Sequence, residues 1–229
     1  MKKTLAMLFV LIISQIIFAQ TKIDEYERLN SDAESGRLTM LHSYILESPN
    51  SKGQILIYPK EKTPLGKILR HIYGIRAYTG LDNSSLIIET GRERKKPFNE
   101  IWLIKEGEKK ISINSVSYED KLNDKIKKKT LFDRECILCE PTVDLDQYIF
   151  RQGLDYFAKA LKANPKASAL IEIATVQYLS ETKKERRELI AKIYNSLVKK
   201  HLIKQSRIKI EFIGSDNASF YLIPNSTRK

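Results

Sequence analysis

The chain has two cysteines, Cys136 and Cys139, which are three residues apart in the motif C-I-L-C. Thiol–disulfide enzymes place this spacing at the start of a helix that follows a strand, so a redox site is one prediction. A structural disulfide, favoured in an oxidising compartment, and a pair of free thiols stay open beside it. We expect no metal site, because zinc needs four ligands at suitable spacing and the three histidines are scattered singly, at His42, His71 and His201.

Other motifs that carry catalytic chemistry are missing from the sequence. It contains no G-x-S-x-G, no H-E-x-x-H and no phosphate-binding loop, and it has nine glycines in all. Asp144 and Asp146 lie near an expected helix start, where carboxylates complement the helix dipole. Trp102, Phe220 and Tyr221 could stack on a sugar or partner group, although core packing explains them as well. We therefore expect a protein that is not an enzyme and has no cofactor.

The N-terminus has the layout of a secretory signal peptide. Lys2 and Lys3 precede an apolar run, Leu5–Phe18, and Ala19 then precedes polar residues. We expect cleavage after Ala19, with an uncleaved anchor as the alternative because Ile17 is bulky for its position. The apolar run is shorter than the about 20 residues that span a bilayer, and no later stretch approaches that length. The sequence thus predicts an exported protein, periplasmic or secreted, with no transmembrane span after cleavage.

The chain is strongly basic, with a formal net charge of +12 at pH 7. A surface of this charge attracts anions. For an exported protein these are envelope polymers, lipid headgroups or acidic proteins, and nucleic acid is not expected. The basic clusters are scattered along the chain and are interpreted as solvated loop or helix faces, at residues 92–96, 125–129 and 183–187.

An internal repeat organises the sequence. An offset of 116 residues aligns a helical and then an alternating apolar pattern, for example Leu41 with Phe157 and Ile55 with Ile171. The offset becomes 122 across the next helix and strand, and 119 at the last strand, where Trp102 aligns with Tyr221. Because the offset changes only where loops are expected, we interpret the pattern as one supersecondary unit used twice.

Each copy of the repeat predicts a helix, a strand, a helix and a closing hairpin of two strands, preceded by a leading strand. In the first copy we expect helices at 32–47 and 63–78 and strands at 21–26, 54–59, 85–91 and 99–107. In the second copy we expect helices at 143–164 and 180–202 and strands at 130–135, 168–175, 207–214 and 218–225. A short strand at 110–113 is expected to extend the first copy.

The predicted fold class is α/β, an α+β sandwich in which the helices of each copy pack on a mixed sheet. The predicted domain boundaries are 1–19 for the signal peptide, 20–109 for the first repeat, 110–130 for a basic linker and 131–229 for the second repeat.

Each copy resembles the C-terminal domain of OmpA-like proteins, as two tandem, degenerate βαβαββ-type units. The resemblance depends on element order and on Ile23-Asp24, Pro49, the strand Glu100–Ile104, Pro165 and the segments YNSLVKKHLI and SRIKIEFIG. It implies contact with peptidoglycan, for which the family uses an Asp after the second strand and an Arg in N-x-x-L-S-x-x-R-A. This chain departs from that motif, since Leu189 and Lys67 stand at the Arg position. Arg186 and Arg187 lie close enough to substitute and are our candidate ligand-binding residues, with surface charge as the alternative.

The function we expect from the sequence is an exported, non-enzymatic protein of the cell envelope. It would bind peptidoglycan, another anionic envelope component or an envelope protein. The alternative is a thiol–disulfide redox protein that uses Cys136 and Cys139.

Overall fold

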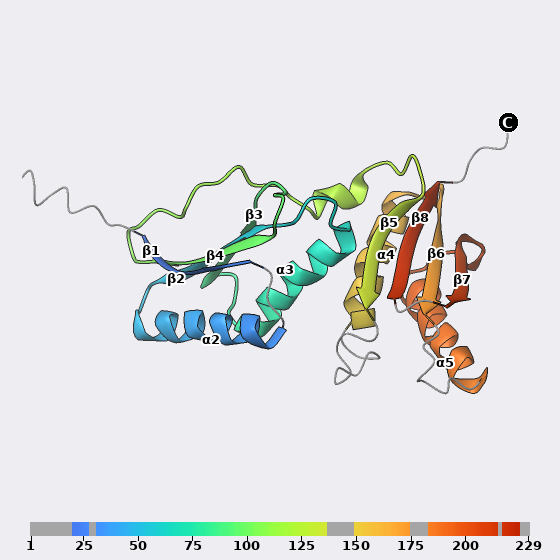
Figure 1. Cartoon of the computed structure of the whole chain (residues 1–229), viewed down its shortest axis with the longest axis horizontal. Helices are drawn as coiled ribbons and strands as arrows, with labels where there is room; N and C mark the ends of the chain where they lie inside the picture. The colour runs from blue at the N-terminus through green and yellow to red at the C-terminus, as the bar shows by residue number, and fades with distance from the viewer. Residues whose placement is uncertain (1–19, 28–30, 137–148, 175–182, 215–216, 225–229) are drawn as a thin grey trace, which may run out of the picture. The chain divides into compact units, whose positions relative to one another are not determined.

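The computed structural model of the chain describes residues 20–27, 31–136, 149–174, 183–214 and 217–224 (Figure 1). The predicted signal peptide and Cys139 lie outside these residues. The described part is a mixed α/β protein with two four-stranded sheets, which confirms the predicted fold class. None of its helices is both long enough and apolar enough to cross a membrane.

The order of elements repeats, as the sequence predicts. The first repeat consists of β1 (Thr21–Tyr26), α2 (Ser31–Glu47), β2 (Lys52–Tyr58), α3 (Leu65–Thr79), β3 (Leu86–Thr90) and β4 (Phe98–Ile104). The second consists of β5 (Thr130–Cys136), α4 (Ile149–Ala163), β6 (Ala167–Ala174), α5 (Lys183–Tyr194), β7 (Ile208–Ile213) and β8 (Asn217–Pro224). Both leading strands are therefore present.

The two closing strands of each repeat do not form the expected hairpin. The strand order is β1-β4-β2-β3 in the first sheet and β5-β8-β6-β7 in the second. The crossover through α3 brings β3 parallel to β2, and β4 runs antiparallel between β1 and β2. A strand that returns through a helix can pair in parallel beside its predecessor, so the free edge of β2 is left for β4. The hairpin prediction was wrong for this reason, and the second sheet has the same arrangement.

Helix α2 covers one face of the first sheet. Its apolar stripe includes Leu38 and Leu41, both fully buried, and the helix ends just before Pro49, which cannot continue it. On the strand facing it, a Cβ at Gly53 would lie 2.9 Å from Leu41 Cδ2 and 3.1 Å from Ile45 Cδ1, so the side chains of the helix pack directly on glycine backbone. The face of β2 that carries Gly53, Ile55 and Ile57 is thus the core face of this sheet.

The core of the second sheet is built around three phenylalanines. The Phe157 ring on α4 lies with its centroid 5.4 Å from that of Phe132 on β5 and 5.6 Å from that of Phe220 on β8, the latter edge to face. All three are buried. Such pairs stabilise a core beyond the area they bury.

The described chain forms two compact units. Unit 1 contains the residues up to Glu61 together with Ile75–Val116, and unit 2 contains Lys62–Gly74 together with the residues from Ser117 onward. Most of helix α3, residues 65–74, therefore belongs to unit 2 although the first repeat supplies its sequence.

The segment after β4 is irregular where a short strand was expected. Residues 110–113 form no strand, and Ile111 instead exchanges hydrogen bonds with the side chain of Gln54 on β2. Farther along, Val116 N donates to Thr90 O at the edge of β3. These hydrogen bonds hold residues 111–116 against β2 and β3, on the face of the sheet opposite α2. The isoleucines of KISI alternate as they would in a strand. The backbone N–H and C=O of Ile111, however, form their hydrogen bonds with the buried side chain of Gln54.

Candidate functional site

The strand alternation of β4 separates a core face from a second face that carries chemistry. Asn99, Ile101 and Leu103 are buried on the core face, while Phe98, Glu100 and Trp102 lie on the other face and are half-buried. The neighbouring strands place their own side chains beside them, because Tyr58 pairs with Phe98, Glu25 with Glu100 and Lys22 with Trp102. Polar and aromatic groups thus gather on the β1–β4 half of this face.

Cations and aromatic rings alternate across this surface. The Arg94 guanidinium carbon lies 3.6 Å from the centroid of the Tyr58 ring and 5.4 Å from that of Phe98. Lys22 Nζ lies 5.8 Å from the Phe98 centroid and 5.4 Å from the Trp102 ring. These distances are within the range of cation–π attraction. We call the five residues Tyr58, Arg94, Phe98, Lys22 and Trp102 the ladder surface.

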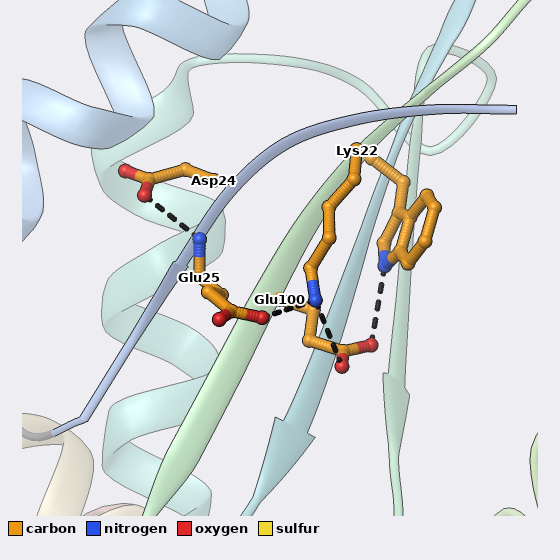
Figure 2. Close-up of polar contacts among 5 residues, drawn as sticks. Lys22, Asp24, Glu25 and Glu100 are labelled. Atoms are coloured by element: carbon orange, nitrogen blue, oxygen red, sulfur yellow. Dashed lines mark hydrogen bonds and ion pairs between the residues drawn. The ribbon is translucent and has the colours of Figure 1, made fainter.

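Two carboxylates adjoin one end of the ladder surface (Figure 2). Lys22 Nζ donates to Glu25 Oε2 and, at 3.3 Å, to Glu100 Oε1, and the indole Nε1 of Trp102 donates to Glu100 Oε2 at 3.2 Å. The side chain of Glu25 is more than half exposed, whereas that of Glu100 is mostly covered. Positive and negative groups are therefore held side by side at an accessible place.

The electrostatics of the surface follow from these contacts. The hydrogen bond to Glu25 is the main reason that the pKa of Lys22 is raised, against a smaller opposing effect of burial, and the charge of Glu100 adds to it. Burial, followed by the Glu100 charge, raises the pKa of Tyr58. Lys22 is thus a stable cation and Tyr58 a neutral phenol at neutral pH, and both can act as hydrogen-bond donors.

The backbone around Tyr58 holds the other end of the ladder surface. A Cβ at Gly91 would lie 2.4 Å from Tyr58 Cε1 and 2.5 Å from Cδ1, so the ring packs closely against glycine backbone. Arg94 N donates to Pro59 O at 2.8 Å, and Glu61 N donates to Arg94 O at 2.8 Å. These bonds fix the loop that presents the guanidinium to the Tyr58 ring.

The site residues expected from the sequence lie elsewhere. Arg186 and Arg187 are on α5; the Arg187 side chain is exposed, and the side chain of Arg186 is outside the described residues. Cys136 is the last residue of β5, and Cys139 is outside the described residues. Both the arginine site and the redox site therefore stay predictions. In the part of the chain that the structure describes, no group of three or more His, Cys, Asp or Glu side chains is placed to hold a metal ion.

The ladder surface was missed in the sequence because its members come from four separate segments. Only the alternation of Phe98, Glu100 and Trp102 within FNEIWLI is a local signal, and it indicates a second face of the strand without indicating which residues of other segments lie beside it. Among the three aromatic candidates for stacking, Trp102 is half-buried in the ladder surface and Phe220 is core. Tyr221 has Lys129 Nζ 4.1 Å from its ring centroid, a smaller counterpart in the second sheet.

No protein-family model matches the chain, and no curated protein matches it.

Proposed function

We propose that the protein is an exported, non-enzymatic binding protein of the cell envelope and that the ladder surface is its contact with peptidoglycan. The observation that carries the proposal is the alternation of cations, aromatic rings and carboxylates on an accessible sheet face. Peptidoglycan offers sugar rings that pack on aromatic side chains and peptide stems that carry both carboxylate and amine groups. A surface with Lys22, Glu25 and Glu100 within hydrogen-bond distance suits such groups of both signs.

The resemblance to OmpA-like domains supports the same ligand class. In that family an arginine and an aspartate hold the two charged groups of the peptide stem. Here the arginine of the family motif is replaced, and Lys22 with its two carboxylates offers equivalent chemistry at another place on the fold.

A pull-down with purified peptidoglycan tests the proposal. The exported protein should be retained at low salt and lose retention as salt rises, because screening weakens exposed charge contacts. Lys22→Gln combined with Glu100→Gln should lower retention about tenfold, as expected for two charge-assisted hydrogen bonds.

The matched control is Lys105→Gln, which removes one exposed lysine just beyond β4 and outside the ladder surface. It should leave retention unchanged. Absence of retention at low salt would exclude peptidoglycan as the ligand. A loss caused by Arg186→Ala plus Arg187→Ala, with none from the ladder variant, would move the site to α5.

A further inference from the structure

The second helix of each repeat ends in the same left-handed turn, made by different residues. Helix α3 is followed by Gly80 with a φ of 61°. Helix α5 continues as a π-helical turn, η2 (Asn195–Lys200), and Leu202 follows with a φ of 58°. The two residues are equivalent in the repeat, at the offset of 122. This position closes a helix in the left-handed conformation and is usually glycine.

Leucine is unfavourable at this position. A side chain with a Cβ is strained at such a φ, because the Cβ approaches the following carbonyl oxygen. Three described residues other than glycine have positive φ, namely Asn50, Lys62 and Leu202, and Leu202 is the one apolar member. Asparagine adopts this conformation at a lower energetic cost than leucine, so the turn by itself does not favour leucine at this position.

The strain does not serve the core. Leu202 is 81% exposed, the highest value among the large hydrophobic residues that are exposed in the described chain. The turn instead sends the next residue inward, since Ile203 is 3% exposed and its N–H donates to Leu197 O at 2.9 Å. Strained backbone positions that do not serve core packing are characteristic of functional sites.

The neighbours of Leu202 are basic. Lys199, Lys200 and Lys204 are all exposed, and residues 199–204 read KKHLIK without an acidic residue. Asp155 on α4 accepts hydrogen bonds from Lys200 Nζ at 2.8 Å and shares a 2.7 Å contact with His201 Nε2. These contacts tie the turn to α4. Lys199 and Lys204 are exposed and lie within three residues of Leu202 in the sequence.

We infer that residues 199–204 form a lipid-contact tip, in which Leu202 enters an anionic membrane surface and the lysines contact its headgroups. An exposed leucine with exposed lysines on both sides of it in the sequence matches a bilayer interface, where apolar chains lie beneath negative charge. A hydrated anionic polymer would use the lysines but would gain nothing from the leucine. The lipid-contact tip lies in unit 2, and the inference does not depend on the ladder surface.

Co-sedimentation with vesicles tests the inference. The exported protein, with its N-terminal residue identified by mass spectrometry, is mixed with vesicles of phosphatidylcholine and phosphatidylglycerol or of phosphatidylcholine alone. We expect binding to the anionic vesicles only. Leu202→Asn should weaken it about tenfold through lost apolar burial, and Lys199→Gln plus Lys204→Gln by a similar factor or more at low salt.

The controls separate lipid contact from folding. Leu202→Asn should unfold at the same temperature as the unmodified protein or higher, because asparagine relieves the backbone strain. Leu46→Asn removes another leucine, 72% exposed on α2 and adjacent to Glu47, and should leave vesicle binding unchanged. Trp102→Ala should leave it unchanged as well, so failure here and failure of the ladder surface are distinguishable.

Four results would overturn the inference. Three come from the vesicles: no binding to the anionic vesicles, equal binding by the Leu202→Asn variant, and an equal loss from Leu46→Asn. The fourth is a soluble polyglutamate that binds with the same dependence on Leu202, which would make an acidic polymer the partner.

Discussion

The leading strand of each sheet carries the same bulge and the same aspartate, but the arginine that pairs with it comes from a different helix. In β1 the register shifts between Lys22 and Asp24, and in β5 it shifts between Leu131 and Asp133. Each aspartate accepts a hydrogen bond from the N–H of the next residue, at 2.7 Å for Asp24 and 2.8 Å for Asp133. Asp24 then pairs with Arg37 of α2.

The second repeat lacks the arginine that matches Arg37. The equivalent position, at the offset of 116, is Gly153. Within unit 2, Arg70 of α3 donates from Nε to Asp133 Oδ2 at 2.8 Å and from Nη2 to Oδ1 at 3.0 Å, and a Cβ at Gly153 would lie 3.4 Å from Arg70 Cδ. The space left by the missing side chain is thus occupied by the replacement. A repeat can thus keep its aspartate while the arginine that binds it comes from another helix.

The largest effect is expected from Arg70→Met. Asp133 is almost fully buried and the Arg70 side chain is 15% exposed, so the variant leaves a buried carboxylate without its bidentate partner. We expect the free energy of unfolding to fall by about 3 kcal/mol. Arg37→Met breaks the more exposed pair of the first repeat and should cost about 1 kcal/mol or less. Urea denaturation measures both.

A compensating variant sharpens this test. Gly153→Arg in the Arg70→Ala background returns the arginine to the helix position used by the first repeat, and should recover part of the lost stability. If Arg70→Met and Arg37→Met cost the same, the two pairs are equivalent and burial does not distinguish them.

A second, smaller effect concerns the approach of α3 to β5. A Cβ at Gly66 would lie 2.7 Å from Phe132 Cε1 and 2.8 Å from Asp133 Cβ, both in the buried core. Gly66→Ala should therefore lower the unfolding free energy by about 1–3 kcal/mol through overpacking. Gly36→Ala, in α2 with nothing within 4 Å, should raise it by about 0.5–1 kcal/mol, because alanine is the better helix former. Thermal unfolding of the two variants would contradict this reasoning if their shifts had the same sign.

The smallest effect is a pH dependence specific to the second repeat. Burial alone raises the pKa of Asp155, but hydrogen bonds and charge from Lys200 and His201 outweigh it and lower that pKa. A carboxyl whose pKa is lower in the folded state adds stability above its unfolded pKa, about 3.9, and loses it as the pH falls through the folded value. Since the Asp155 side chain is 36% exposed, we expect less than about 1 kcal/mol.

Chemical denaturation at pH 5 and pH 3 measures this dependence. Asp155→Asn should abolish its share of the stability difference. Thr39 stands at the equivalent position of the first repeat, where it bonds to Ser35 O, and Thr39→Ala should leave the pH dependence unchanged.

Local patterns in the sequence were sufficient to predict the elements and the repeat. The expected strand at 54–59 and the expected helix at 63–78 agree with β2 and α3 within a few residues at each end. In both leading strands the bulge falls at an apolar residue followed by aspartate, which is Ile23-Asp24 in β1 and Phe132-Asp133 in β5. The predictions of a closing hairpin and of a short strand at 110–113 were wrong. Strand pairing and the hydrogen bonds between Ile111 and Gln54 depend on residues that are distant in the sequence.

Apolar periodicity and turn residues act over a few neighbouring positions, and they were enough to predict that two βαβαββ units follow one another along the chain. The tertiary structure was needed to show which strands pair, which arginine binds Asp133 and which side chains form the ladder surface. Those outcomes depend on contacts between segments tens of residues apart. The turn at Leu202 depends on both the sequence and the tertiary structure. The repeat offset aligns Leu202 with Gly80, and the structure shows that both residues have a positive φ and that the leucine is exposed.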